Sequence, residues 1–216
     1  MDDTTITLSS SRPGFRIKQR RSQKTYDALI TTGFRLLEEK EWTAITIAEL
    51  SRKAGYSVGA FYARFRSKDD YFDALIQYQG EIREAALNKL LSSTPPSKLI
   101  GKVVENFVTY HWHYRNYWRA ALVRGMRDPN FWIPLRQGGH KSVTMFINRI
   151  SEYRGKALTV AEETQVRFGF QVLFGVINNT IINQPGPIFM GQVEFVDNLT
   201  RTLLLVTDYE RLIKSQ

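Results

Sequence analysis

Apolar residues recur along most of the chain at intervals of three and four residues, the spacing of one face of an α-helix. The first such stripe comprises Tyr26, Leu29, Ile30, Gly33, Phe34 and Leu37. Before it, residues 1–23 combine Ser, Thr and a Pro13-Gly14 pair with a run of basic side chains. The pattern therefore predicts a flexible basic arm over residues 1–23 and a first helix that begins near Tyr26.

Two short helices are predicted next, because polar residues that start and end helices punctuate the sequence there. Thr46 and Glu49 form a capping box, in which the threonine hydroxyl and the glutamate carboxylate each accept a hydrogen bond from an exposed amide. Gly55 supplies the left-handed residue that ends this helix. Ser57 is suited to cap a third helix that runs to Phe65.

A long amphipathic helix follows. The residues Ser67-Lys68-Asp69-Asp70 resemble a second capping box, and the Pro95-Pro96 pair ends the pattern. The helically spaced apolar residues between these two points are Phe72, Leu75, Ile76, Ile82, Ala86 and Leu90.

About five further helices are predicted beyond Pro96, since scattered Gly and Pro residues divide an otherwise helical pattern and no strand alternation is visible. One stripe consists of Val103, Phe107, Tyr110, Tyr114, Tyr117 and Ala121, with a break near Arg115-Asn116. The expected fold class is all-α. An N-terminal three-helix helix-turn-helix domain at residues 24–70 is joined through the long helix to a C-terminal helical domain at residues 71–216.

Charge and cysteine content narrow the function. The 30 Lys and Arg residues exceed the 21 Asp and Glu residues, and the net charge of +9 favours a polyanionic partner, either nucleic acid or an anionic membrane surface. The absence of cysteine excludes disulfides, thiol catalysis and cysteine-ligated metals. Residues 1–11 lack the features of a secretory signal, and no apolar run reaches the roughly 18–20 residues that span a bilayer. We therefore expect a cytoplasmic protein without a membrane partner.

Residues 24–72 resemble the DNA-binding domain of the TetR/AcrR family of transcriptional regulators. The matching residues are Trp42, Thr46, Ala54, Gly55, Ser57, Gly59, Tyr62, Phe65, Ser67, Lys68, Asp69 and Asp70. Three positions depart from the family pattern: Glu41 replaces a common glycine, Val58 a frequent polar residue, and Tyr71 a leucine. These departures leave the expected fold intact, and no operator sequence is carried over from the family.

The second short helix is expected to enter the major groove of DNA. Its small, nearly uncharged start at residues 57–60 allows close approach to base edges and thymine methyl groups. The resemblance implies that Tyr62 and Lys68 bind phosphates. The expected DNA-binding residues are Thr46, Ser57, Val58, Gly59, Ala60, Tyr62, Ala63, Arg64 and Lys68, with Arg16, Lys18, Arg20 and Arg21 of the arm.

Two enzymatic or metal-binding alternatives fit poorly. Residues 55–59 match the G-x-S-x-G pattern of α/β-hydrolases, but that nucleophile must follow a buried strand, and a capped helix is expected here. His111, His113 and His140 lack the i, i+4 spacing that chelates a metal. We expect no catalytic residue, no metal and no cofactor, so an esterase is disfavoured.

Aromatic residues concentrate between positions 107 and 132. Such a stripe is consistent with a packed core, a ligand pocket or an interfacial membrane helix, and we favour a pocket because Tyr and Trp carry polar atoms that need partners. The expected ligand-binding residues are Phe107, Tyr110, Tyr114, Tyr117, Trp118, Trp132, Phe174 and Asn178. The neighbouring charges are Arg115, Arg119, Arg124 and Arg127, which favour a small-molecule effector that is neutral or anionic and apolar or aromatic.

Helix 160–184 is apolar on two faces and must be covered twice. One face carries Val166, Phe170, Leu173, Ile177 and Ile181, and the other carries Phe168, Val172, Gly175 and Ile182. The resemblance implies that this helix and the last one, 192–213, pack against their copies in a homodimer, although a fully internal helix pair is the alternative. The expected interface residues are Phe168, Val172, Gly175, Phe195, Leu199 and Leu203, and the pattern does not decide which face of helix 160–184 is outward.

The resemblance therefore implies a homodimeric, ligand-responsive transcriptional repressor. It would bind a palindromic double-stranded DNA operator and release it when the effector occupies the C-terminal domain. A transcriptional activator, or an architectural DNA-binding protein without a working pocket, is the alternative.

Overall fold

The structure is a computed structural model that describes residues 13–214 of the chain, with side chains described from Ser22 onward. Its elements are α1 (Pro13–Glu39), η1 (Trp42–Ala44), α2 (Ile47–Lys53), α3 (Val58–Tyr62), α4 (Lys68–Ser93), α5 (Pro96–His113), α6 (Arg115–Arg127), α7 (Trp132–Arg154), α8 (Val160–Asn183), α9 (Val193–Val206) and α10 (Tyr209–Lys214). Within residues 13–214 no strand forms, and Met190 and Gln192 share only an isolated bridge.

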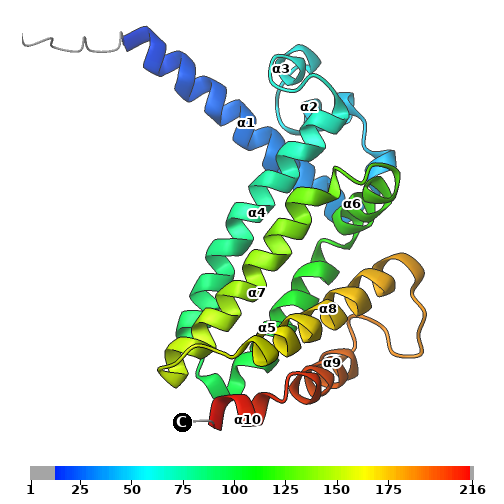
Figure 1. The fold of residues 1–216 in the computed structure, drawn as a ribbon. Helices are drawn as coiled ribbons and strands as arrows, with labels where there is room; N and C mark the ends of the chain where they lie inside the picture. The colour runs from blue at the N-terminus through cyan, green and yellow to red at the C-terminus, as the bar shows by residue number, and fades with distance from the viewer. Residues whose placement is uncertain (1–12, 215–216) are drawn as a thin grey trace, which may run out of the picture.

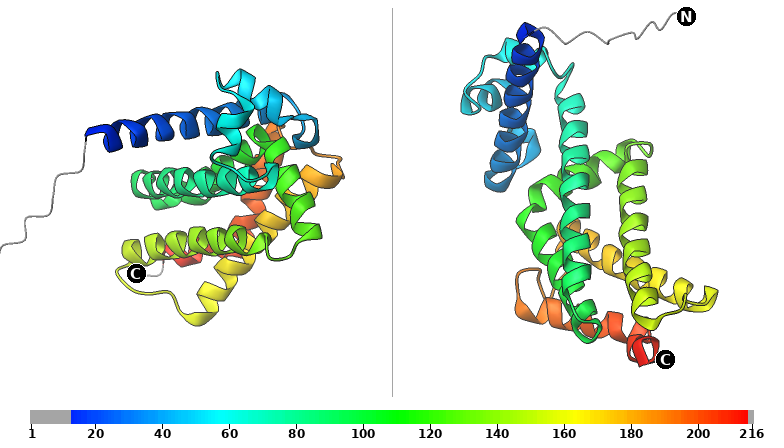
Figure 2. Two further views of the ribbon diagram at one scale, coloured as in Figure 1. Left: turned by 90° about the horizontal axis from the view of Figure 1, so that it is seen from above. Right: turned by 90° about the vertical axis from the view of Figure 1, so that its left-hand side faces the viewer.

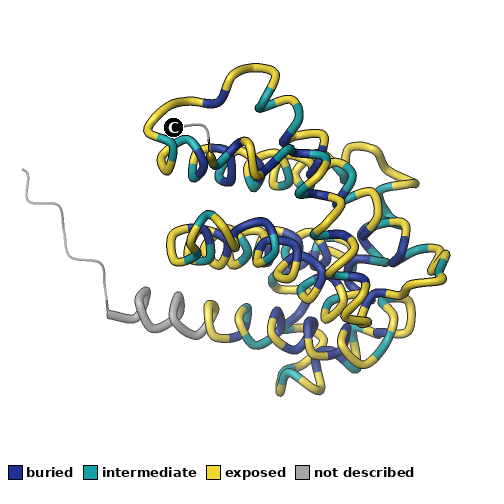
Figure 3. The backbone as a smooth tube through the Cα atoms, turned by 90° about the horizontal axis from the view of Figure 1, so that it is seen from below, coloured by how far each residue is buried: buried dark blue, intermediate teal, exposed yellow. Residues whose placement is uncertain are grey.

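The helices are arranged along one long axis. Helices α1, α2 and α3 lie at one end, α9 and α10 lie at the other, and α4 runs between the two ends beside α7 (Figures 1 and 2). Buried residues occupy the sides on which the helices face one another (Figure 3). The expected all-α fold, with a helix-turn-helix end and a second helical domain, is confirmed.

The predicted helix caps are present. Thr46, Ser57 and Ser67 each accept a hydrogen bond from the amide three residues on, with distances of 3.1, 3.1 and 3.0 Å. Gly55 has φ +80° and ends α2. The reciprocal half of the first capping box does not form, because Lys40 Nζ holds the Glu49 carboxylate at 2.7 Å.

Several helix boundaries differ from the sequence-based expectation. Helix α1 begins at Pro13, so residues 13–23, expected in the arm, continue the first helix, while residues 1–12 lie outside the described residues. Helix α3 ends at Tyr62 rather than Phe65. Six helices follow Pro95 instead of five, because Asp208 at φ +47° separates α10 from α9.

The buried face of α4 shifts along the helix. Near its start the buried residues are Tyr71, Phe72, Leu75 and Ile76, as the stripe predicted. Further on, Ile82 and Ala86 are exposed, and the interior instead receives Gln79, Leu87 and Leu91. The expected stripe fails there because the inward residues follow one another at intervals of four, which places Gln79 and Arg83 on the interior side.

Tyr71 joins α4 to α1. Its hydroxyl donates a hydrogen bond to the backbone carbonyl of Leu29 at 2.7 Å, and its ring packs within 5.4 Å of Phe61 and 4.9 Å of Phe65 between ring centres. The hydroxyl lies so close to α1 that a Cβ placed on Gly33 would clash with it. Gly33 is therefore required by the tyrosine that departs from the family pattern.

We predict that Gly33→Ala destabilises the protein. In an unobstructed helix interior, alanine is more favourable than glycine by about 1 kcal/mol. Here the methyl group displaces buried Tyr71, and a net loss of about 1–3 kcal/mol is expected as a lower melting temperature by circular dichroism.

The control is Gly80→Ala in α4, where no atom lies within 4 Å of the added methyl group and stability should rise. In a Tyr71→Leu background, which lacks the obstructing hydroxyl, Gly33→Ala should lower the stability much less than it does in the unmodified protein. A melting temperature of Gly33→Ala at or above that of the unmodified protein would contradict this account.

Candidate functional site

Helix α3 packs against the rest of the chain on one side and is exposed to solvent on the others. Phe61 is buried beneath it, whereas Val58 and Tyr62 are 41% and 53% exposed. Ser57 and Gly59 are also exposed, and Ala60 is half-buried. The predicted recognition helix thus presents a smooth surface of small side chains, bounded at its end by the Tyr62 hydroxyl.

Lys68 stands at the start of α4. Its ammonium group donates to the Trp42 carbonyl at 2.7 Å and lies 4.4 Å from the centre of the Trp42 ring. Partial burial lowers its pKa, and neighbouring Asp69 opposes that shift. Because an ammonium has three donors, two remain available for a phosphate.

The other predicted DNA-binding residues divide into three groups. Thr46 and Ala63 are exposed. Arg64 donates to the backbone carbonyls of Ser22 at 3.3 Å and Ala60 at 2.9 Å, so its guanidinium ties α3 to α1. The side chains of Arg16, Lys18, Arg20 and Arg21 lie outside the described residues.

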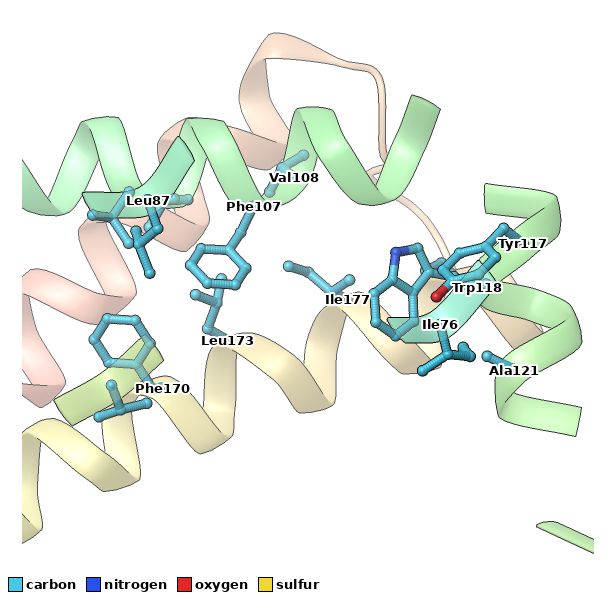
Figure 4. Packing of buried hydrophobic residues seen from close by; sticks show 14 of the residues in the cluster. Ile76, Leu87, Phe107, Val108, Tyr117, Trp118, Ala121, Phe170, Leu173 and Ile177 are labelled. Carbon is cyan, nitrogen blue, oxygen red and sulfur yellow. The ribbon is translucent and has the colours of Figure 1, made fainter. Parts of the chain in front are cut away.

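A cavity of about 1160 Å³ lies among α4, α5, α6, α7 and α8. Seven of the eight predicted ligand-binding residues line it: Phe107, Tyr110, Tyr117, Trp118, Trp132, Phe174 and Asn178. Figure 4 shows part of the surrounding packing, with Phe107 and Phe170 toward one end, Tyr117 and Trp118 toward the other, and Ile177 between them.

Tyr114 does not line the cavity. Its ring packs 5.8 Å from that of Phe34 in α1 and 5.0 Å from that of Tyr110. The reason is the break between α5 and α6, because Tyr114 lies at the junction and leaves the helical repeat that the stripe assumed.

Polar atoms enter the cavity wall from three helices. The Tyr110 hydroxyl donates to Gln79 Oε1 at 3.0 Å, and burial raises the Tyr110 pKa so that this group stays protonated. The buried Trp118 indole N–H makes no hydrogen bond of normal geometry, although it lies close enough to the Tyr110 hydroxyl to oppose that shift. The indole N–H and the Tyr110 hydroxyl therefore lie beside each other in the cavity wall.

Arg83 of α4 is a cavity residue that the sequence reasoning did not select. Its guanidinium carbon lies 4.4 Å from the ring centre of Tyr110, 5.2 Å from Phe107 and 5.5 Å from Trp118. Its position was detectable from Ile76, since Arg83 lies seven residues on and thus on the same helix face.

The four arginines used to infer the effector charge lie mostly elsewhere. Among Arg115, Arg119, Arg124 and Arg127, only Arg124 lines the cavity, and its guanidinium pairs with Asp73 at 2.9 Å. The positive charges that line the cavity therefore come mainly from residues other than these four, namely Arg83, Arg136, Lys141 and Arg167.

His111 is buried in the wall between α5 and α6. Its Nδ1 lies 2.7 Å from the Phe107 carbonyl oxygen, so we assign the proton to Nδ1, and its ring stacks 4.6 Å from that of Trp118. Burial, assisted by the charge of Arg83, lowers the pKa of His111 to about 3. The described residues hold no cluster of three or more His, Asp or Glu that would bind a metal.

Helix α6 touches both the cavity and the helix-turn-helix end. Tyr117 lines the cavity, and its ring lies 5.7 Å from that of Phe34 in α1. Asn116 Nδ2 donates to the Leu37 carbonyl at 2.8 Å, and Arg124 donates to the Asp69 carbonyl at 3.1 Å. A shift of α6 would therefore act on α1 and on the start of α4.

The predicted interface residues fall on two different sides. On α8, Phe168 is 56% exposed, Gly175 is exposed and Val172 is half-buried, so this face is outward and the face of Phe170 is inward. On α9, Phe195, Leu199 and Leu203, expected in the dimer interface, are buried within the chain, so they leave little surface for contact with a second copy. They cover α5 and α8, and the outward side of α9 instead carries Val193 and Leu205.

Among the described helices, none is long and apolar enough to cross a membrane.

Comparisons with known proteins support the fold and the helix-turn-helix. Residues 29–75 match the family model described as bacterial regulatory proteins, tetR family. A curated relative, the uncharacterized HTH-type transcriptional regulator YwcC of Bacillus subtilis strain 168, is 38% identical over 63 residues. Those residues are 29% of this chain and 27% of the relative, so the match spans about a quarter of the relative's length.

Two solved structures share the fold over nearly their full lengths. A TetR transcription regulator from Haloarcula marismortui has a TM-score of 0.69 at 15% identity, with 86% of this chain and 97% of that chain covered. A putative TetR-family transcriptional regulator from Mesorhizobium loti has a TM-score of 0.68 at 14% identity, with 86% and 98% covered. At these identities the likeness shows a common fold.

A capped helix-turn-helix followed by a helical domain defines a class of helix-turn-helix regulators. Within that class, residues 29–75 of this chain match the helix-turn-helix domain of the tetR family of bacterial regulatory proteins, and the described helices share the fold of solved TetR regulators.

We predict that His111 makes the protein less stable in mild acid. The imidazole has a pKa near 6.5 in the unfolded chain and about 3 in the fold, so between these values the unfolded state binds more protons. Lowering the pH from 7 to 5 should therefore cost on the order of 2 kcal/mol of stability through this residue.

The measurement is urea unfolding at both pH values in the unmodified protein and in His111→Phe, whose loss on acidification should be smaller. The exposed His140→Gln variant is the control and should keep the original pH dependence. Equal pH dependence in all three proteins would show that His111 is not held neutral by the fold.

Proposed function

We propose that this protein is a homodimeric transcriptional regulator that binds a near-palindromic operator through α3 and releases it when an effector fills the helical cavity. The observation that carries the proposal is the tetR-family match over residues 29–75, which contains the capped and exposed start of α3. The net charge of +9 supports a DNA partner.

The surface of α3 supports reading of base edges. Ser57, Val58 and Gly59 are exposed and short, so the start of the helix is able to approach the floor of the major groove. Tyr62 is exposed at the end of α3, and Lys68 is half-buried at the start of α4; both side chains carry donors suited to phosphates. The basic residues Arg16, Lys18, Arg20 and Arg21 would add phosphate or minor-groove contacts.

The contacts of α6 support a route from the cavity to the DNA. An effector that displaces Tyr117 or Trp118 moves α6, and α6 bonds to α1 through Asn116 and to the start of α4 through Arg124. Two recognition helices must stand about 34–36 Å apart to reach successive major grooves. An effector that binds the altered spacing more tightly than the DNA-competent spacing shifts the protein away from DNA. The resulting loss of operator affinity is limited by the difference in effector affinity between these two states.

The outward faces of α8 and α9 support dimerisation. Phe168 and Val176 on α8 and Val193 and Leu205 on α9 are exposed apolar residues on neighbouring helices. Burying them against a second copy would remove this apolar surface from water and fix the spacing of the two DNA-binding ends. We propose this pair of faces, without Phe195, Leu199 and Leu203, as the dimer interface.

The first expected outcome concerns DNA recognition. Operator sequences selected from a random duplex library by the unmodified protein should change when Val58 is replaced by Thr, because this side chain would face bases. Tyr62→Phe and Lys68→Gln should weaken binding to all sequences similarly. Lys68→Gln, which removes a cation, should also reduce the slope of log affinity against log salt by about 0.9.

Fluorescence anisotropy with selected and scrambled duplexes measures both effects. Lys156→Gln removes the same charge from an exposed site in the α7–α8 loop and should leave binding nearly unchanged. If Val58→Thr weakens all sequences alike, α3 does not read bases as proposed.

The second expected outcome concerns the dimer. Phe168→Asp would place an unpaired carboxylate in the interface at a cost of several kcal/mol, so sedimentation should show monomers that no longer bind the operator specifically. The exposed Ile82→Asp on α4 is the control and should remain dimeric. Dimers that persist in both Phe168→Asp and Leu205→Asp would place the interface elsewhere.

A further inference from the structure

Arg83 is a charged side chain that neither the helix packing nor the proposed DNA contacts use. It projects from α4 into the cavity, where the rings of Tyr110, Phe107 and Trp118 surround its guanidinium at 4.4–5.5 Å. Stacking on an aromatic face occupies the plane of a guanidinium and leaves the N–H donors on its edge free.

No carboxylate among the described residues pairs with Arg83. Its titratable neighbours are the phenol groups of Tyr110 and Tyr117, whose pKa values burial raises, so both stay protonated and uncharged. The acidic residues that line the cavity are engaged elsewhere: Asp73 with Arg124 at 2.9 Å, Glu84 with Lys141 at 2.7 Å, and Asp128 with the backbone amide of Asn130 at 3.0 Å.

This arrangement is costly without an anion. Withdrawal from water lowers the pKa of Arg83, which shows that its surroundings disfavour the charge. A guanidinium nevertheless stays charged and offers five N–H donors, so a cavity anion would satisfy both its charge and its hydrogen bonds. Because His111 is neutral, it does not compete for that anion.

The remaining cavity wall specifies the rest of the ligand. Phe107, Trp132, Phe174 and Met145 present apolar surface around a volume of about 1160 Å³, above the 300–1000 Å³ typical of small-molecule pockets. A molecule that fills this space must be largely apolar. Its polar group must be planar and anionic to match the edge of a stacked guanidinium, which a carboxylate does through two parallel hydrogen bonds.

We infer that the cavity binds an apolar carboxylic acid and that Arg83 pairs with its carboxylate. This inference rests on the proposed function in that the cavity is taken as the effector site. It narrows the class of effector from neutral or anionic apolar molecules to carboxylates, whose apolar part is either an aromatic ring system or an acyl chain.

The test compares acids with amides of the same shape by isothermal titration calorimetry. The probes are 2-naphthoate against 2-naphthamide for an aromatic body, and decanoate against decanamide for an acyl body. In the unmodified protein at least one acid should bind about tenfold or more tightly than its amide, the effect of one charge-assisted hydrogen bond.

Arg83→Gln should abolish that preference, whereas Arg83→Lys, which keeps the charge, should retain part of it. Arg136→Gln is the matched control, since Arg136 also lines the cavity but is exposed at its edge, and it should keep the full preference. Melting curves of each variant identify any that fails to fold.

The pair that shows the preference identifies the aromatic or the acyl class. Equal or undetectable binding of acid and amide in both pairs, or a preference that survives in Arg83→Gln, would overturn the inference. Operator release is measured in parallel. Acids that bind through Arg83 without releasing DNA would refute the proposed regulation alone, and amides that bind and release DNA as well as acids would refute the carboxylate inference alone.

Discussion

The rest of the structure depends on the continuity of α4. This helix has 26 residues and, at 1.5 Å per residue, extends about 39 Å. Its first turns belong to the helix-turn-helix end, where Lys68 bonds to Trp42 and Tyr71 bonds to α1. Further along, the same helix carries Gln79 and Arg83 into the cavity. A hydrogen-bonded helix transmits displacement along its axis, so the two ends of the molecule share one rigid element and cannot rearrange independently.

The polar groups in the cavity wall lower the stability of the fold, because an apolar wall would need no hydrogen-bond partners. A fully apolar filling would pack better than a wall containing a desolvated guanidinium, a neutral imidazole and an indole N–H without a hydrogen bond. These groups lie where α4, α5 and α6 meet. The ring of Tyr117 in α6 also packs against that of Phe34 in α1. A change in the contacts of this polar wall can therefore reach the helix-turn-helix end through packed aromatic side chains.

Local signals in the sequence were sufficient to place the helix caps of the helix-turn-helix end. Thr46, Ser57, Ser67 and Gly55 act through bonds within three residues, so spacing alone identified them. In the second domain, the burial of each helix face depends on which neighbouring helix covers it, and the spacing of apolar residues does not identify that neighbour. Phe195 and Leu199 were apolar at the right spacing, yet they face inward. Arg83 was missed for the related reason that a charged residue on an apolar face looks like an interruption until the cavity around it is known.

The sharing of α4 has a consequence for exchanging the DNA-binding end of this chain with that of another protein of the same fold. A chimaera joined at residue 70, where the motif ends, would take Tyr71 and Phe72 from a different parent than Gly33 and Trp42. Tyr71 needs the glycine in α1, and the Phe72 ring lies 4.8 Å from that of Trp42 but also 5.7 Å from that of Tyr117 in α6. An exchange that keeps both sets of contacts must place its crossover within α4, beyond Ile76, and must transfer the facing residues of α6 with the DNA-binding end.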